Sequence, residues 1–201
     1  MQRIQEQYPS EKPQRLVDTI DKVQISDMKH QCLTGEPSPW VVKHLPLIRK
    51  GGRVLDLACG SGRHAIWIAQ QGYQVDAVDR DVQAVSGMVG MDNINIIVLD
   101  LEAGEWLRPD QRYDGIVVSR YLYRPLLPIL PEILNPGGVL IYETFMEGNG
   151  RFGKPSNPDF LLLHDELLAL YSPLLSIYAF EQGGESKPKP AVMQRICAKN
   201  L

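Results

Sequence analysis

From Arg53 onward, short apolar runs alternate with amphipathic segments along the chain. Each run is bounded by glycine or polar residues, which is typical of strands that are buried on both faces of a parallel sheet. Between the runs, the spacing predicts helices at 62–72 and 81–89, and a helix at 125–134 that prolines interrupt. The predicted strands are 53–58, 73–79, 95–100, 113–119 and 139–145.

The pattern changes after the fifth predicted strand. A long polar loop, 146–159, is rich in Gly, Asn and Pro and precedes an apolar helix predicted at 160–171; loops of this length are often functional. Two strands, 174–182 and 191–199, follow with no helix between them, so we expect an antiparallel hairpin. The whole pattern predicts an α/β fold: a Rossmann-like, doubly wound, mostly parallel seven-stranded sheet with a C-terminal antiparallel hairpin.

The N-terminal part of the chain lacks this regular alternation. Residues 1–36 carry two prolines and only a weak helical spacing, and they run into the turn-rich stretch 34–39. We therefore expect an N-terminal extension or lid at 1–36 and one main domain at 37–201.

The composition is that of an ordinary globular protein. Hydrophobic residues make up 44% of the 201 residues and charged residues 22%, which excludes a disordered chain, a collagen-like chain and a disulfide scaffold. The net charge is −3. Because nucleic-acid phosphates need a basic face, we expect no nucleic-acid partner. The sequence leaves open whether the protein is a monomer or a homodimer.

Cysteines, histidines and apolar segments bear on compartment and metal binding. Cys32, Cys59 and Cys197 are far apart and in no CxxC pair, so neither a zinc site nor a disulfide framework is predicted. The four histidines are scattered, and we predict no metal site. The N-terminus has no apolar run, and no segment approaches the roughly 18 apolar residues of a membrane helix. We therefore expect a cytoplasmic protein without a membrane partner.

The strongest local signal is the run DLACGSG, from Asp56 to Gly62, at the end of the first predicted strand. Gly60 and Gly62 let the backbone approach a ligand closely, and the following helix offers free N–H donors to a phosphate or carboxylate. The segment from Gly60 also fits GxGxxG/A, so a dinucleotide is an open alternative. A tight turn that simply needs glycine is the plainer explanation of the same run.

Two further aspartates follow the next two predicted strands. Asp79 ends the second strand, where a carboxylate can accept both hydroxyls of an adenosine ribose. Asp100 ends the third strand, where a carboxylate can accept from an adenine amino group. One acidic residue after a strand is common, but Asp56, Asp79 and Asp100 after three successive strands are harder to explain as turns.

The runs VLDLACGSGRH, VDAVDRD, VLDLE, YDGIVVS and NPGGVLIYETF together resemble the motif series of class I S-adenosylmethionine-dependent methyltransferases. The resemblance covers residues 40–200 and is nearest to the small bacterial enzymes of the tellurite-resistance and thiopurine type. It implies a methyltransferase domain, S-adenosylmethionine as the cofactor, and transfer of its methyl group by in-line displacement. Ala58 departs from the family pattern, which has its first glycine at this position.

The resemblance also implies which residues hold the methionine part of the cofactor. Gly60, Gly62 and the backbone around Ala58 would line this part, and Asp56 would orient it. Arg63 is a cation at a helix N-terminus, where the helix dipole does not stabilise it. It therefore needs an anionic partner, such as the cofactor carboxylate, unless it is simply a surface residue.

The nucleoside part of the cofactor would be held after the second and third strands. By the same resemblance, Asp79 would bind the ribose, and Asp100 with the backbone of Leu101 would bind the adenine. Arg80 would flank the adenine or remain a solvated charge. The residues expected near the sulfonium are Ser119 and Arg120.

The methyl acceptor should bind after the fourth and fifth strands. Tyr121, Tyr123 and Glu143 are the candidate catalytic residues. Glu143 ends the fifth strand, where it can act as a base, bind a cation or cap a turn. The two tyrosines alternate, so only one faces the site if that stretch is extended, and core packing is an equal alternative. Other candidates on the acceptor side are Arg124, Tyr142, Asn149 and Arg151.

Three functions remain open from the sequence. The leading one is a methyltransferase acting on a small molecule, because the chain is acidic and lacks the motifs of DNA-base methyltransferases. The second is a regulatory module that binds the cofactor without transferring methyl, since no catalytic base is unambiguous. The third is a nicotinamide-dependent oxidoreductase, which GxGxxA and Asp79 would serve but which needs no counterpart of Asp100.

Overall fold

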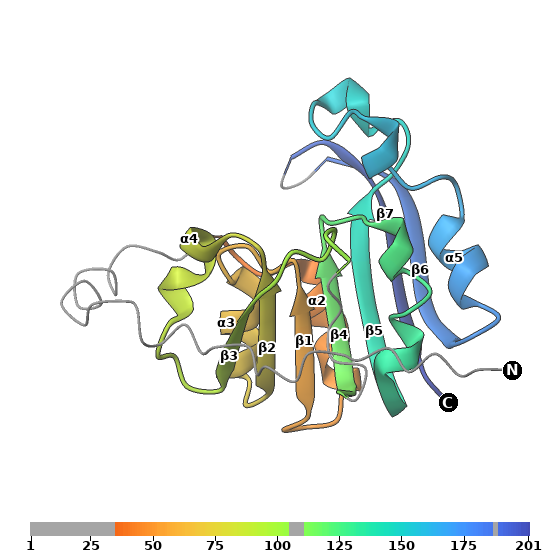
Figure 1. Cartoon of the computed structure of the whole chain (residues 1–201). Coiled ribbons are helices and arrows are strands. Elements are labelled where there is room, and N and C mark those ends of the chain that lie inside the picture. Colours follow the sequence, from red (N-terminus) through yellow and green to blue (C-terminus); the bar gives the residue numbers. More distant parts are fainter. Residues whose placement is uncertain (1–34, 105–110, 187–188) are drawn as a thin grey trace, which may run out of the picture. The chain divides into compact units, whose positions relative to one another are not determined.

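A seven-stranded sheet carries the fold, with the strand order β3-β2-β1-β4-β5-β7-β6 (Figure 1). Strands β1 to β5 pair in parallel, whereas β7 pairs antiparallel with both β5 and β6. The predicted mostly parallel sheet with a C-terminal antiparallel hairpin is confirmed. The strands are β1 (Arg53–Leu57), β2 (Gln74–Asp79), β3 (Ile94–Val98), β4 (Tyr113–Ser119), β5 (Leu134–Phe145), β6 (Ser176–Glu185) and β7 (Ala191–Lys199).

The computed structural model describes residues 35–104, 111–186 and 189–201. They belong to one unit, Leu33–Leu201. Almost all of the predicted N-terminal extension, residues 1–36, lies outside the described residues. In the described parts of the chain, no helix is both long enough and apolar enough to cross a membrane.

Helices cover both faces of the sheet (Figure 1). One face carries α2 (Pro39–His44), α3 (Arg63–Gln70) and α4 (Val82–Val85). The other face carries α5 (Glu166–Tyr171) and two 3-10 turns, Arg124–Leu126 and Pro131–Ile133, in the segment predicted as a proline-interrupted helix. Further 3-10 turns are Leu45–Leu47, Ser86–Met88, Asn149–Phe152 and Pro158–Phe160.

Alternation along the strands decides which side chain enters which layer. Leu55 of β1 packs in the layer of α5, whereas its neighbour Val54 packs in the layer of α3. On β1, β4 and β5, the positions of Asp56, Ser119 and Glu143 are in phase with Val54, on the face of the sheet that α3 covers. Strand alternation therefore brings three polar side chains to the same face of the sheet, next to the start of α3.

The predicted helix at 160–171 is wrong in its first part, because α5 begins only at Glu166. Before it, the backbone is extended and pairs with the end of β5. The Leu162 N–H donates to the Phe145 carbonyl at 3.0 Å, and the Glu147 N–H donates to the Leu162 carbonyl at 2.8 Å. Pairing with a strand end thus overrides the helical pattern of this apolar segment.

The helix predicted at 81–89 and the start of β5 also differ from the predictions. The helix predicted at 81–89 divides into α4 and the 3-10 turn Ser86–Met88. Gly87 lies in that turn, and glycine has a low helix propensity. Strand β5 begins at Leu134 instead of residue 139, because Leu134 pairs with Tyr113 ahead of a register shift.

Candidate functional site

Aspartates lie at or just beyond the carboxyl ends of β1, β2 and β3. These residues are Asp56, Asp79 and Asp100. Asp79 connects the ends of two strands. Its Oδ2 accepts from the Gly60 N–H at 2.7 Å, and its Oδ1 accepts from the Asp81 N–H at 3.0 Å. A carboxylate oxygen has two lone pairs. Asp79 therefore holds the loop after β1 and still has acceptors for the hydroxyls of a ligand.

The loop after β1 has a left-handed backbone at Ala58 (φ 55°), Gly60 (φ 56°) and Gly62 (φ 85°). A Cβ on Gly60 would meet no heavy atom within 4 Å, so the backbone there faces open space. A Cβ on Gly62 would lie 2.1 Å from the sulfur of Met88. Gly60 thus leaves room for a ligand, whereas Gly62 must be glycine because the core packs against it. Ala58 keeps the backbone conformation that favours glycine.

Asp56 is a buried carboxylate with an incomplete set of partners. Its side chain is 1% exposed, and its Oδ2 has no hydrogen-bond partner within residues 35–104, 111–186 and 189–201. Burial raises its pKa to about 7, against the opposing effects of the Ala65 backbone N–H and the Arg63 charge. A buried charge without a partner is costly. A ligand ammonium placed at this oxygen would remove that cost.

Asp100 and Arg80 face each other across the ends of β3 and β2. Arg80 Nη1 lies 3.7 Å from Asp100 Oδ2, and both side chains are well exposed. The other carboxylate oxygen accepts from the Glu102 N–H at 2.9 Å. The Leu101 side chain is buried in the core, so only its backbone is available to a ligand. This exposed pair is accessible to a ligand at the edge of the sheet.

A chain of polar side chains crosses the ends of β4, β5 and β7. Arg63 Nη2 donates to Ser119 Oγ at 3.0 Å, and the Ser119 hydroxyl donates to Glu143 Oε1 at 2.9 Å. Glu143 Oε2 accepts from Arg195 Nε at 3.2 Å, and Arg195 also pairs with Glu185. Glu143 is 3% exposed. With both oxygens engaged, it positions Ser119 and Arg63.

Two guanidinium groups lie near the end of β4. Arg120 has a left-handed backbone (φ 57°) and an exposed side chain. Burial, followed by the charge of Arg120, lowers the pKa of Arg63. No carboxylate of the described residues comes within ion-pair distance of either guanidinium. An anionic group of a ligand would therefore be stabilised here.

Several candidates from the acceptor side have structural partners instead. Tyr142 is 1% exposed, and its hydroxyl donates to the Tyr121 carbonyl at 2.9 Å. Arg124 donates to both carboxylate oxygens of Glu166, at 2.7 Å and 2.9 Å. Asn149 is buried, and its side chain bonds to backbone groups on both sides. These three side chains fix the loops around the site.

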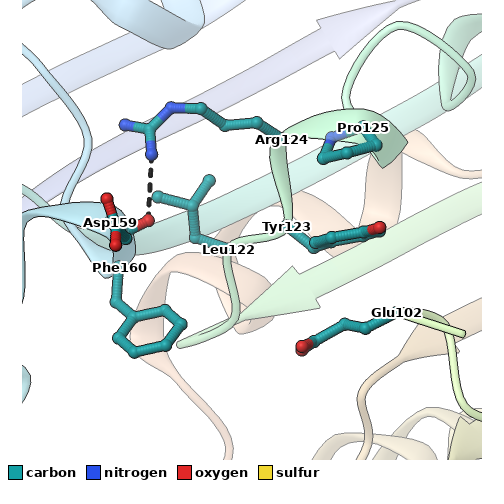
Figure 2. A pocket seen from close by; sticks show the side chains of 7 residues that line it. All are labelled: Glu102, Leu122, Tyr123, Arg124, Pro125, Asp159 and Phe160. Carbon is teal, nitrogen blue, oxygen red and sulfur yellow. Dashed lines mark hydrogen bonds between the residues drawn. The ribbon is translucent and has the colours of Figure 1, made fainter.

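Tyr123 lines a pocket of about 320 Å³, whose walls come from the loops after β3, β4 and β5 (Figure 2). Figure 2 shows the Glu102 carboxylate pointing toward the space between the rings of Tyr123 and Phe160. Tyr121 comes directly before the pocket-lining residues of the loop after β4 in the sequence. Burial and the negative charge of Glu102 raise its pKa, so its hydroxyl stays neutral near pH 7. The lining residues are Glu102, Leu122, Tyr123, Arg124, Pro125, Asp159 and Phe160.

Sequence reasoning missed two residues of this site. Arg195 was not a candidate, because only the register of β5 and β7 places it opposite Glu143. His64 was considered only as a metal ligand, but it is buried, and its Nε2 accepts from the Ser38 N–H at 3.1 Å. Burial lowers its pKa to about 4, so it is a neutral acceptor. Among the residues with described positions, no group of three or more His, Cys, Asp or Glu side chains could hold a metal.

The groups at this edge of the sheet fit S-adenosylmethionine. The unpartnered oxygen of Asp56 matches the ammonium of an amino acid, and Arg63 matches its carboxylate. Asp79 has acceptors for ribose hydroxyls, and the exposed carboxylate of Asp100 can accept from an amino group of a nucleobase. The open space at Gly60 leaves room between these groups. The chemistry of each group thus corresponds to one part of the same molecule.

A family model and several solved structures resemble this chain. A family model described as a methyltransferase domain matches residues 28–168. Among solved structures, TehB from Haemophilus influenzae superposes with a TM-score of 0.71 at 20% identity, covering 84% of this chain and 64% of that chain. A TehB-like SAM-dependent methyltransferase from Corynebacterium glutamicum gives a TM-score of 0.60 at 16% identity, covering 81% of this chain and 87% of that chain.

Two curated relatives that are named as methyltransferases match over shorter stretches. The ribosomal RNA small subunit methyltransferase C of Alcanivorax borkumensis is 31% identical over 102 residues, which are 45% of this chain and 31% of that protein. The ribosomal protein L11 methyltransferase of Campylobacter concisus is 29% identical over 102 residues, covering 49% of this chain and 36% of that protein. The chain thus spans about a third of the length of these two relatives.

Replacing Gly60 and Gly62 one at a time distinguishes a glycine that core packing requires from a glycine that leaves room for a ligand. Gly62→Ala should lower the free energy of unfolding by about 2–4 kcal/mol, because the new Cβ meets Met88 and the backbone is left-handed. Gly60→Ala should cost only about 1–2 kcal/mol, from the backbone alone. Urea denaturation without ligand measures both values. Equal losses in the two variants would contradict the packing role of Gly62.

Removing the buried charge of Asp56 should stabilise the ligand-free protein in a pH-dependent way. Its folded pKa of about 7 lies above the ordinary value of 3.8. The stability that neutral Asp56 contributes is therefore complete below pH 4 and is lost as the pH rises through 7. Asp56→Asn should raise the free energy of unfolding by about 2 kcal/mol more at pH 8 than at pH 5. Denaturant titrations at both pH values test this, and an equal gain at both would contradict it.

Proposed function

The chain belongs to the methyltransferase domain family, and from this premise we propose that it transfers the methyl group of S-adenosylmethionine to a small molecule. One observation carries the proposal. At the end of β1, an open backbone at Gly60 lies next to a buried Asp56 oxygen that lacks a partner and to Asp79. Neither a tight turn nor a helix cap explains a buried carboxylate oxygen without a partner.

Each part of the cofactor has residues suited to hold it. Asp56 would hold the ammonium of the methionine part and Arg63 its carboxylate, and the open backbone at Gly60 would leave room for this part. Asp79 accepts from the ribose hydroxyls without giving up its hold on the loop, since its second lone pairs are unused. Asp100, with the backbone of Leu101, binds the adenine. When bound, the cofactor supplies a methyl group activated by a positively charged sulfur.

The protein itself then has to align the acceptor with the methyl group of the cofactor. Holding the acceptor in line with the methyl–sulfur bond contributes about 7–11 kcal/mol to lowering the barrier. Ser119 lies at the end of β4, held between Arg63 and Glu143, and it fixes that side of the site. Tyr121 contributes a neutral hydroxyl, and Tyr123 contributes a ring wall toward the acceptor. Glu143 acts by positioning, because both its oxygens are engaged.

A small acceptor is favoured over a macromolecule. The pocket beside Tyr123, of about 320 Å³, lies at the lower end of the volumes typical of small-molecule sites. The net charge of −3 disfavours an RNA substrate. The two curated relatives act on ribosomal RNA and a ribosomal protein by their names, but this chain spans only about a third of each. Family membership also sets the nicotinamide alternative aside.

Asp79→Ala should weaken binding of S-adenosylhomocysteine, the demethylated product, by about 1–3 kcal/mol, because the ribose hydroxyls lose a charged acceptor. Asp81→Ala is the matched control, since the Asp81 side chain caps α4 and accepts only from Gln83 and Ala84 N–H groups. Isothermal titration calorimetry of both variants and the parent measures the effect. Unchanged affinity in Asp79→Ala would show that this residue only shapes the loop.

Gly60→Val should abolish cofactor binding while the protein stays folded, because the side chain fills the open space over the loop without meeting protein atoms at its Cβ. Native mass spectrometry with added S-adenosylmethionine reads out binding, and circular dichroism reads out folding. Retained binding would contradict the placement of the cofactor over Gly60. If the parent protein binds the cofactor but a broad acceptor screen gives no turnover, the regulatory alternative gains support.

A further inference from the structure

The pocket in Figure 2 has a composition that selects its ligand by charge. Its floor and walls are apolar or aromatic, from Leu122, Tyr123, Pro125 and Phe160, and Glu102 faces them from the loop after β3. We infer that this pocket binds a small amine with an apolar or aromatic body, and that this amine is the methyl acceptor. The second half of the inference rests on the proposed function.

The one cation in the pocket wall is already neutralised. Arg124 donates from Nε and Nη2 to both oxygens of Glu166, and its Nη1 and Nη2 donate to the Asp159 and Leu161 carbonyls at 2.9 Å and 2.8 Å. All three of its nitrogens are therefore engaged within the protein. Figure 2 shows its guanidinium directed at the Asp159 backbone, away from Glu102.

The Glu102 carboxylate has the neutral Tyr121 hydroxyl as a partner, but no cation of the described residues forms an ion pair with it. Neither Glu102 nor Asp159 has a Lys, Arg or His within ion-pair distance in the part of the chain that the structure describes. The negative charge of Glu102 and Asp100 also contributes to the raised pKa of Tyr121. As far as the described residues are concerned, Glu102 therefore makes the potential in this pocket negative, which attracts an ammonium and repels an organic acid.

The aromatic rings also favour a positively charged ligand. Phe160 is 50% exposed, and Figure 2 shows its ring across the space from Tyr123 and Glu102. Ring faces attract cations, and they also cover the apolar body of a ligand. A carboxylate and two rings around about 320 Å³ suit an amine of about ten non-hydrogen atoms.

The reaction of such an amine balances without a further reactant. The bound ammonium first releases one proton to water. The nitrogen lone pair then forms a bond to the methyl carbon as the carbon–sulfur bond breaks, and that electron pair stays on sulfur. The product is a methylated ammonium, so the charge lost by sulfur is gained by nitrogen.

Binding of matched probes to protein saturated with S-adenosylhomocysteine tests the inference. Phenethylamine, 2-phenylethanol and 3-phenylpropionate have a similar body and carry positive, zero and negative charge at pH 7.5. By titration followed with NMR at constant ionic strength, phenethylamine should bind about fivefold more tightly than 2-phenylethanol, with 3-phenylpropionate the weakest. Equal or tighter binding of the alcohol or the acid, or no binding of any probe, would overturn it.

Two variants assign the preference to the pocket. Glu102→Gln should reduce the advantage of the amine over the alcohol to less than about twofold, because the charge is lost and the shape is kept. Glu147→Gln is the matched control, an exposed glutamate that does not line the pocket, and it should keep the full preference. A preference that survives in Glu102→Gln overturns the assignment.

The same titrations separate this inference from the proposed function. Failure of the parent protein to bind S-adenosylhomocysteine removes the proposed function, while phenethylamine binding to the free protein still measures the pocket. If S-adenosylhomocysteine instead displaces phenethylamine, the pocket belongs to the cofactor and the inference is overturned.

Discussion

The hydrogen bond from the Gly60 N–H to the Asp79 carboxylate, 2.7 Å long, joins the ends of β1 and β2 and sets the form of the whole site. It holds the loop after β1, in which Ala58 and Gly60 are left-handed and the backbone of Gly60 faces open space. The same carboxylate accepts from the Asp81 N–H, at the start of α4. One aspartate thus links two strand ends and a helix start and still offers acceptors to a ligand.

Charge is sorted along the carboxyl edge of the sheet. The ends of β1, β2 and β3 carry carboxylates, whereas Arg63 and Arg120 lie near the end of β4 without a carboxylate at ion-pair distance among the described residues. A zwitterionic amino acid attached to a nucleoside matches this distribution from one end to the other. Glu143 has a structural role in this arrangement, because Ser119 and Arg195 engage both its oxygens.

The sequence predicted the strands, their order of alternation with helices and the C-terminal hairpin, because buried parallel strands leave an unmistakable apolar pattern. It failed at 160–171, where an apolar segment with helical spacing instead pairs with the end of β5 around Leu162. It also suggested Arg124 and Tyr142 as acceptor-side residues, although Arg124 donates to Glu166 and the Tyr142 hydroxyl donates to the Tyr121 carbonyl. Local pattern contains no information on such distant partners.

The sequence by itself determined which strand ends carry an aspartate and which loop carries glycine, because strand periodicity and turn chemistry are local properties. Only the tertiary structure decided that one oxygen of the buried Asp56 lacks a partner among the described residues, that Gly62 is required by Met88, and that Glu143 is engaged by Arg195. Each of these depends on the register between strands or on packing between layers. Contacts between residues far apart in the chain are fixed only when the sheet and its helices come together.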